Sequence, residues 1–265
     1  MAAVSMHKSG GSLTQSSVLL LGGKISPGYI RQIINLTQTT SGSYLLMSSL
    51  DISRRNLALR GEKVFGDVVE LAGYTRDEIN AIGDYWAFGA DLINGESVFG
   101  FDETKLSVYT RDIGLAGIEV YALLRDEYDI QIEFGDLSNI LAYISIGDRK
   151  RDVERLVGAL SEIRRKYRGD KAGLMSREYL SPQVVLSPQA AFYSKKEQIP
   201  LSYGATGRIA GEFVMCYPPG IPILAPGEKI SHNVIDYIEY AKEKGCSLTG
   251  PEDSKIRKIN VTVDN

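Results

Sequence analysis

One short stretch near the start of the chain combines a hydroxyl, an imidazole and an amine within four residues. Ser5, His7 and Lys8 follow a short apolar run, and Gly10 and Gly11 come directly after them. A lysine at the end of a strand can form a Schiff base with an aldehyde cofactor. The hydroxyl and the imidazole can hold an anionic group such as a phosphate, and the glycines let the backbone approach a cofactor closely. The alternative is an exposed lysine in an ordinary solvated turn.

Three longer segments resemble one known family, in the order in which that family carries them. The segments are residues 5–17, 39–51 and 217–228. Each resembles the ornithine/lysine/arginine decarboxylases, which are pyridoxal-phosphate enzymes of the aspartate-aminotransferase fold. Because the three segments are spread over most of the chain, the sequence is identified as a member of this family.

The resemblance implies a role for each polar residue of the first segment. Lys8 would carry pyridoxal 5'-phosphate, and Ser5 and His7 would contact its phosphate. Ser41 would reach the cofactor phosphate of the partner subunit, because the corresponding loop lies at the dimer interface in the family. The family usually has a proline where this chain has Gly42, which leaves the stiffness of the loop open. A homodimer or higher oligomer with a shared active site is therefore implied.

The reaction implied by the resemblance is the decarboxylation of a basic amino acid, so the protein would be a lyase. The short segment 217–228 is most similar to that of the shorter biosynthetic decarboxylases of Gram-positive type. Conversion of arginine to agmatine, in polyamine biosynthesis, is the leading reaction, and lysine or ornithine is the alternative substrate. A cationic side chain needs a carboxylate partner, for which Glu212 is the candidate.

The place of Lys8 in the chain suggests that part of the site comes from elsewhere. In the family, the lysine lies near the middle of a much longer chain. The aspartate that pairs with the pyridine nitrogen and the histidine that stacks on the ring both precede it. We therefore expect this chain to correspond to the C-terminal half of an enzyme and to have little or no decarboxylase activity alone. The alternative is a non-catalytic fragment, or half of a split enzyme.

Short strands are expected on either side of Lys8. Residues 2–6 and 17–21 are apolar and predict two short buried strands that flank the Lys8 turn. Parallel neighbours would be needed to cover such a strand on both faces. Ser26 and Pro27 predict the start of a helix that runs to about residue 38, with the serine as N-cap.

A polar loop and a long helix are expected next. Residues 39–43 predict the loop, with a special backbone angle plausible at Gly42. Residues 44–73 have helical spacing, and Gly61 and Gly66 favour a bend or break in this helix. A linking helix of this kind places a domain boundary near residue 75.

Alternating strands and helices are expected after that boundary. The predicted elements are strands 105–109, 130–134, 140–146, 209–216 and 259–263, and helices 115–128 and 149–167, with further helices starting at Ser187-Pro188 and Ser231. The prolines within residues 217–228 predict a rigid turn that cannot be a central strand.

The predicted fold class is α/β in two parts. Residues 1–75 would be the C-terminal remainder of the large, aspartate-aminotransferase-like (fold-type I) domain that binds pyridoxal phosphate. Residues 76–265 would form a small C-terminal α/β domain, with a possible subdivision near residue 186.

The composition excludes several other classes of protein. The 265 residues are 43% hydrophobic and 24% charged, as expected of a globular protein. The net charge is −3, and no basic block predicts nucleic-acid binding. No apolar run is long enough to span a membrane, and the first residues do not form a secretion signal. Cys216 and Cys246 have neither metal-ligand nor disulfide spacing, so we expect no metal and a cytoplasmic location.

Overall fold

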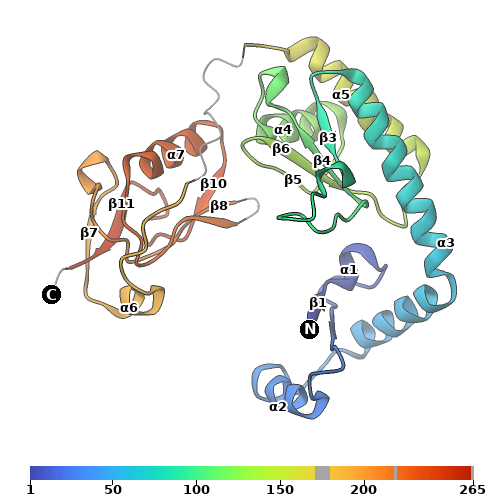
Figure 1. The fold of residues 1–265 in the computed structure, drawn as a ribbon, viewed down its shortest axis with the longest axis horizontal. Coiled ribbons are helices and arrows are strands. Elements are labelled where there is room, and N and C mark those ends of the chain that lie inside the picture. The colour runs from blue at the N-terminus through green and yellow to red at the C-terminus, as the bar shows by residue number, and fades with distance from the viewer. Residues whose placement is uncertain (171–179, 218–219, 264–265) are drawn as a thin grey trace. The chain divides into compact units, whose positions relative to one another are not determined.

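The protein is described by a computed structural model that covers residues 1–170, 180–217 and 220–263. The described residues form a mixed α/β structure (Figure 1). Its elements in chain order are β1 (Ala2–Val4), α1 (Met6–Ser9), β2 (Val18–Leu20), α2 (Pro27–Thr37), α3 (Tyr44–Ile82), β3 (Trp86–Phe88), β4 (Lys105–Tyr109), α4 (Gly117–Tyr128), β5 (Phe134–Gly135), β6 (Asn139–Tyr143), α5 (Lys150–Tyr167), α6 (Pro188–Tyr193), β7 (Lys196–Pro200), β8 (Val214–Tyr217), β9 (Ile221–Leu224), α7 (His232–Glu243), β10 (Ser247–Thr249) and β11 (Lys258–Thr262).

Two compact units divide the chain. The first consists of Met1–Thr75 with Ile144–Val153, and the second of Arg76–Tyr143 with Glu154–Asn265. The division into domains that the sequence predicts at residue 75 stays a prediction. None of the described helices is long and apolar enough to cross a membrane.

The first unit begins with an exposed hairpin rather than with buried strands. β1 and β2 pair antiparallel, with Val4 opposite Val18, and most of their residues are exposed. The predicted burial of these strands is therefore wrong. Among the described residues β1 and β2 pair only with each other, so these residues do not supply the parallel neighbours that a buried strand would need. Lys8 lies on the single helical turn α1, between the two strands.

Helices α2 and α3 complete most of the first unit. The predicted start of α2 is confirmed, because Ser26 Oγ accepts a hydrogen bond from the amide of Tyr29 at 3.4 Å. The sequence predicts a bend or a break in α3. α3 continues through Gly61 and Gly66, so a break is wrong, whereas the helix does bend along its length (Figure 1). Two glycines cost a long helix only about 1 kcal/mol each, which the remaining residues outweigh. Gly42 has no left-handed backbone angle, contrary to expectation.

The second unit contains a four-stranded antiparallel sheet in the order β3-β4-β6-β5. β4 forms over Lys105–Tyr109, as predicted, and its Val108 pairs with Ile140 of β6. The predicted strand 130–134 is wrong, because β5 consists of Phe134 and Gly135 alone. α4 lies against β5 and β6 (Figure 1).

α4 meets this sheet at unusually close range. A Cβ atom added to Gly117 would lie 1.9 Å from the carbonyl oxygen of Asn139, and one added to Gly135 would lie 2.3 Å from the carbonyl oxygen of Gly117. Real Cβ atoms do not approach backbone so closely, so both positions require glycine. The amide of Ile118 donates to the carbonyl of Asp136 at 2.7 Å, which ties the start of the helix to the β5–β6 turn.

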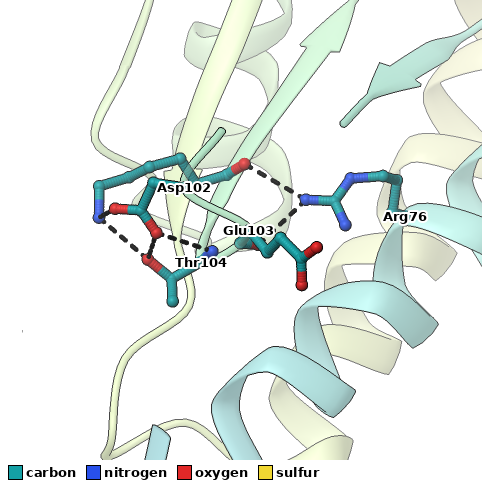
Figure 2. Close-up of polar contacts among 5 residues, drawn as sticks. Arg76, Asp102, Glu103 and Thr104 are labelled. Atoms are coloured by element: carbon teal, nitrogen blue, oxygen red, sulfur yellow. Dashed lines mark hydrogen bonds and ion pairs between the residues drawn. The ribbon is translucent and has the colours of Figure 1, made fainter. Parts of the chain in front are cut away.

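Arg76 ties the end of α3 to the sheet by hydrogen bonds to backbone carbonyls. Its Nε donates to Phe88 at 3.1 Å. Its Nη2 donates to Glu103 at 3.0 Å and to Lys105 at 3.4 Å (Figure 2). A planar guanidinium suits several fixed acceptors at once, whereas a lysine ammonium does not. Arg76 therefore fixes the end of β3 and the beginning of β4 relative to the last turns of the helix.

Asp102 organises the turn that precedes β4. Its carboxylate accepts from the amide and the hydroxyl of Thr104 at 3.1 and 2.7 Å, and it pairs with Lys105 Nζ at 3.0 Å (Figure 2). Burial raises the pKa of the Asp102 carboxyl, but the hydrogen bonds from Thr104 and Lys105 outweigh burial and lower the pKa overall.

The rest of the second unit contains the pair β7–β11 and the three-stranded sheet β10-β8-β9, of which β9 and β10 contact α7. Ser231 caps α7 as predicted, because its Oγ accepts from the amide of Val234 at 3.3 Å. The residues predicted to face the core are buried, among them Ile235 and Ile238. The predicted rigid turn is in part the strand β9, in which Pro222 is tolerated because β9 is an edge strand. Pro218 and Pro219 lie outside the described residues.

Tyr85 predicts an alkaline limit to the stability of the second unit. Tyr85 is 6% exposed, and its hydroxyl donates to the carbonyl of Leu160 at 3.0 Å. Burial raises the pKa of this phenol, partly opposed by Arg164. A raised pKa means that its contribution to folding is fully present below about pH 10 and is lost as the pH rises further.

We therefore expect the free energy of unfolding to fall as the pH rises above about 10, with Tyr85 adding up to about 1.4 kcal/mol per pH unit to that slope. Tyr85→Phe should be less stable at pH 7 by about 1 kcal/mol and should show a shallower alkaline slope. Tyr44→Phe, at an 83% exposed position, is the control. Urea unfolding over this pH range measures both quantities. Equal slopes for Tyr85→Phe and the unmodified chain would contradict the assignment.

Candidate functional site

The structure brings Ser5, His7 and Lys8 together on one turn. Ser5 precedes α1, and its side chain makes no capping hydrogen bond. The amide of Lys8 donates to the carbonyl of Ser5 at 3.0 Å, and the amide of Gly10 donates to Met6 at 2.8 Å. Lys8 is exposed and His7 is half-buried. An amine, an imidazole and a hydroxyl are therefore presented by four consecutive residues whose backbone is held in a tight turn.

One hydrogen bond sets the orientation of His7. Its Nδ1 donates to the carbonyl oxygen of Ser16 at 2.8 Å. Because a carbonyl can only accept, the proton of the neutral ring lies on Nδ1, and Nε2 is left to face a ligand. Nε2 can accept a hydrogen bond when the ring is neutral and can donate one when it is charged.

The residues that hold this turn were not predicted as site residues. The loop after Lys8 is bonded to Ser49 and Ser53 of α3, and Ser16 joins the loop to His7. The available signal was a set of serines in the middle of a predicted helix, where serine is a poor helix former. Gly10 and Ser53 are 43 residues apart in the sequence, so no local pattern predicts their contact.

Ser41 lies in the loop between α2 and α3. It is exposed, and its amide donates to Thr39 Oγ1 at 3.1 Å. This contact is local, and it leaves the hydroxyl of Ser41 on the surface of the first unit. The predicted role of Ser41 toward a partner subunit stays a prediction.

Glu212 belongs to the second unit, where its carboxylate binds backbone and amide groups. Oε1 accepts from the amide of Asn260 at 2.8 Å. Oε2 accepts from Asn260 Nδ2 at 3.0 Å and from the amide of Glu252 at 3.1 Å. These three bonds tie the segment before β8 to β11. The predicted role of Glu212 in substrate binding stays a prediction, and the observed contacts support a structural role.

We expect Glu212→Ala to lower the free energy of unfolding by about 2 kcal/mol, because it leaves the donors of Glu252 and Asn260 without their acceptor. Glu212→Gln keeps an acceptor oxygen and should cost about half as much. Glu243→Ala, at an exposed glutamate, is the matched control. Urea unfolding of the three variants measures the differences. A Glu212→Ala variant as stable as Glu243→Ala would show that these hydrogen bonds do not support the fold.

The donor set of the Lys8 turn suits an organic ligand more than a metal ion. No group of three or more histidine, cysteine or carboxylate side chains that could hold a metal occurs within residues 1–170, 180–217 and 220–263. Lys8 can bind an aldehyde covalently, and Ser5 and His7 can contact an anionic group on the same ligand.

Comparison with known families matches most of the chain. Residues 1–152 match the family model "Orn/Lys/Arg decarboxylase, major domain". Residues 172–253 match the model "Orn/Lys/Arg decarboxylase, C-terminal domain". The two matches are adjacent and follow the order of the chain.

Curated relatives match nearly the whole chain but not their own whole length. The chain is 41% identical over 264 residues to the arginine decarboxylase of Bacillus subtilis (strain 168), in a match that covers 98% of this chain and 54% of the relative. It is 40% identical over 268 residues to the arginine decarboxylase of Halalkalibacterium halodurans, with the same two coverages. The constitutive lysine decarboxylase of Escherichia coli (strain K12) is 23% identical, over 88% of this chain and 44% of the relative. The chain thus spans about half the length of the arginine decarboxylases.

Solved structures share the fold. The lysine decarboxylase of Francisella novicida matches with a TM-score of 0.77 at 19% identity, over 99% of this chain and 48% of that protein. Lysine decarboxylase A from Pseudomonas aeruginosa matches with a TM-score of 0.69 at 17% identity, over 97% of this chain and 48% of that protein. The α/β fold class predicted from the sequence is thereby confirmed.

Proposed function

Because this chain belongs to the Orn/Lys/Arg decarboxylase family, we propose that it serves in the pyridoxal-phosphate-dependent decarboxylation of a basic amino acid, with Lys8 as the cofactor lysine. The observation that carries the proposal is the Lys8 turn, where an exposed amine stands beside His7 and Ser5. An amine bonds the aldehyde, and the two neighbours supply contacts for the phosphate.

The residues of the turn fit pyridoxal phosphate by their chemistry. The Ser5 side chain makes no capping bond to α1, so its hydroxyl can donate to a phosphate oxygen. His7 Nδ1 is bonded to the carbonyl of Ser16, which leaves Nε2 to contact the same phosphate. Lys8 Nζ would hold the aldehyde carbon. When bound, the cofactor supplies a conjugated ring that accepts the electrons left by departing carbon dioxide.

This chain's own residues would perform binding and proton transfer. The substrate amine would replace Lys8 Nζ at the aldehyde carbon. The amine of Lys8, once released, could then donate a proton to the substrate α-carbon. Ser5 and His7 would keep the phosphate in place, so the ring would stay oriented while the amine exchanges. An exposed Lys8 in a rigid turn suits this exchange because its long side chain can move while its backbone does not.

Arginine is the proposed substrate, with lysine or ornithine as the alternative. The relatives that are about 40% identical are named arginine decarboxylases, while those named lysine decarboxylases are more distant. The product from arginine would be agmatine, a polyamine precursor. Glu212 is the candidate partner of the cationic side chain, although it already accepts three hydrogen bonds.

A chimera tests the activity and the substrate. The preceding part of the Bacillus subtilis arginine decarboxylase would be joined to this chain at the aligned position, since the match covers 54% of that relative. We expect the chimera to release agmatine from arginine faster than amines from lysine or ornithine. A folded chimera that binds the cofactor but decarboxylates none of the three would refute the proposal. In the same chimera, Glu212→Gln with an unchanged KM for arginine would remove Glu212 from substrate binding.

A homodimer or higher oligomer with a shared site, in the cytoplasm, completes the proposal. Ser41 would contact the cofactor phosphate of the partner subunit, which agrees with its place in an exposed loop. A cytoplasmic location agrees with Cys216 and Cys246, which are both free and buried. Sedimentation of the chimera and of its Ser41→Ala variant measures whether the subunits form a dimer or a higher oligomer. The affinity of both proteins for pyridoxal phosphate measures whether Ser41 contacts the cofactor phosphate.

A further inference from the structure

Two serines of α3, one helical turn apart, bind the loop that follows Lys8. Ser53 Oγ donates to the carbonyl of Gly10, and Ser53 is only 4% exposed. Ser49 Oγ accepts from the amide of Leu13 at 3.2 Å and donates to the carbonyl of Leu46 at 2.8 Å. The hydroxyl of Ser49 is thus used as donor and as acceptor, and both serines act on backbone groups of one short loop.

Hydrogen bonds continue from this loop to the ring of His7. The hydroxyl of Ser16 donates to the carbonyl of Leu13 at 2.5 Å, and the carbonyl of Ser16 accepts from His7 Nδ1 at 2.8 Å. Ser16 is 2% exposed, and its hydroxyl also contacts that of Ser12 at 2.6 Å. Only the bond from Ser53 to Gly10 is fully buried, and the bond between Leu13 and Ser49 is exposed. A network in which each member is bonded holds its members more rigidly than isolated bonds do.

The other end of the loop is the end of the Lys8 turn itself. Gly10 follows Lys8 by two residues, and its amide donates to Met6 at 2.8 Å. Gly10 therefore closes the turn through its amide and is bonded to Ser53 through its carbonyl. A Cβ atom at Gly10 would lie 2.6 Å from Met6 Cε, so the loop passes the turn at close range.

We propose that Ser53 and Ser49 are positioning residues, which hold the loop after Lys8 against α3 and thereby orient the Lys8 amine and the His7 ring toward the cofactor. The inference rests on the proposed function of Lys8. Neither serine touches a reacting group, and each acts through backbone: Ser53 through Gly10 on the Lys8 turn, and Ser49 through Leu13 and Ser16 on His7.

Amide hydrogen exchange of the 265-residue chain tests the hydrogen bonds without any cofactor. We expect Ser53→Ala to raise the exchange rate of residues 10–16 about tenfold, because opening of the loop then breaks one buried bond fewer. Ser49→Ala should raise the rate at Leu13 about fivefold, and Ser53→Thr should stay near the unmodified chain. Ser48→Ala, an exposed serine of the same helix, is the matched control. Exchange in Ser53→Ala equal to that in Ser48→Ala would overturn the inference.

Trapping of the cofactor on Lys8 distinguishes a role of the two serines in orienting Lys8 from a role in stabilising the loop alone. The chimera is mixed with less than one equivalent of pyridoxal phosphate, reduced with borohydride and digested, and the pyridoxyl adduct on Lys8 is counted by mass spectrometry. We expect severalfold less adduct in Ser53→Ala and Ser49→Ala, and an unchanged yield in Ser48→Ala and Ser53→Thr. Faster loop exchange with an unchanged yield on Lys8 would overturn the positioning role. A chimera with the unmodified sequence of this chain that forms no adduct on Lys8 would instead refute the proposed function, and the inference with it.

Discussion

Lys8→Ala is expected to lower the rate of agmatine formation by the chimera by a factor on the order of 10³ or more, because one side chain supplies both the covalent link to the cofactor and a proton for the substrate. Lys8→Arg should be equally inactive, since a guanidinium keeps the charge but does not bond an aldehyde. The measurement is single-turnover decarboxylation of arginine at saturating pyridoxal phosphate.

Lys24→Ala is the control for this result. Lys24 is also an exposed lysine near the N-terminus, so its loss changes the charge by the same amount. We expect its rate to stay within about twofold of the unmodified chimera, as is usual for surface substitutions. A Lys8→Ala chimera that retains a tenth or more of the activity would contradict the role assigned to Lys8.

Gly117→Ala is expected to destabilise the second unit by about 3 kcal/mol or more, the upper range for overpacking. Its Cβ atom would lie 1.9 Å from the carbonyl oxygen of Asn139, and backbone cannot yield as a flexible side chain can. Relief of the clash would lift α4 from β6 and would break the bond from the amide of Ile118 to Asp136. Urea unfolding measures the loss, and exchange of the β5–β6 turn locates it.

Gly158→Ala is the matched control, because Gly158 lies within α5 and a Cβ atom there meets nothing within 4 Å. The same substitution should stabilise this helix by up to about 1 kcal/mol. We therefore expect the free energy of unfolding to fall in Gly117→Ala and to rise in Gly158→Ala. A Gly117→Ala variant as stable as Gly158→Ala would show that α4 does not pack on the sheet at this distance.

Elements with strong local signals could be predicted from the sequence. α7 was predicted with its cap at Ser231 and its buried face, because a capping serine and an apolar stripe are both local features. β4 was predicted to the residue because apolar side chains alternate over Lys105–Tyr109. Lys8 was proposed as the cofactor lysine from a resemblance, without its three-dimensional surroundings, and this role stays a prediction.

Features that depend on distant partners could not be predicted in the same way. The bond of Ser53 to Gly10 and the approach of Gly117 to Asn139 leave no periodic pattern in the sequence. The exposure of β1 and β2 also escaped prediction, because apolar residues indicate a strand but do not say what covers it. The polar shell of the candidate site is therefore known from the structure and not from the sequence.

Location of the reduced cofactor adduct is the most direct test of the account. The chimera would be treated with one equivalent of pyridoxal phosphate and then with borohydride, and peptide mass spectrometry would assign the modified lysine. The account predicts a pyridoxyl group on Lys8, and in Lys8→Arg the loss of that group without a gain on any other lysine. A pyridoxyl group absent from Lys8, or spread evenly over exposed lysines such as Lys24, would contradict it.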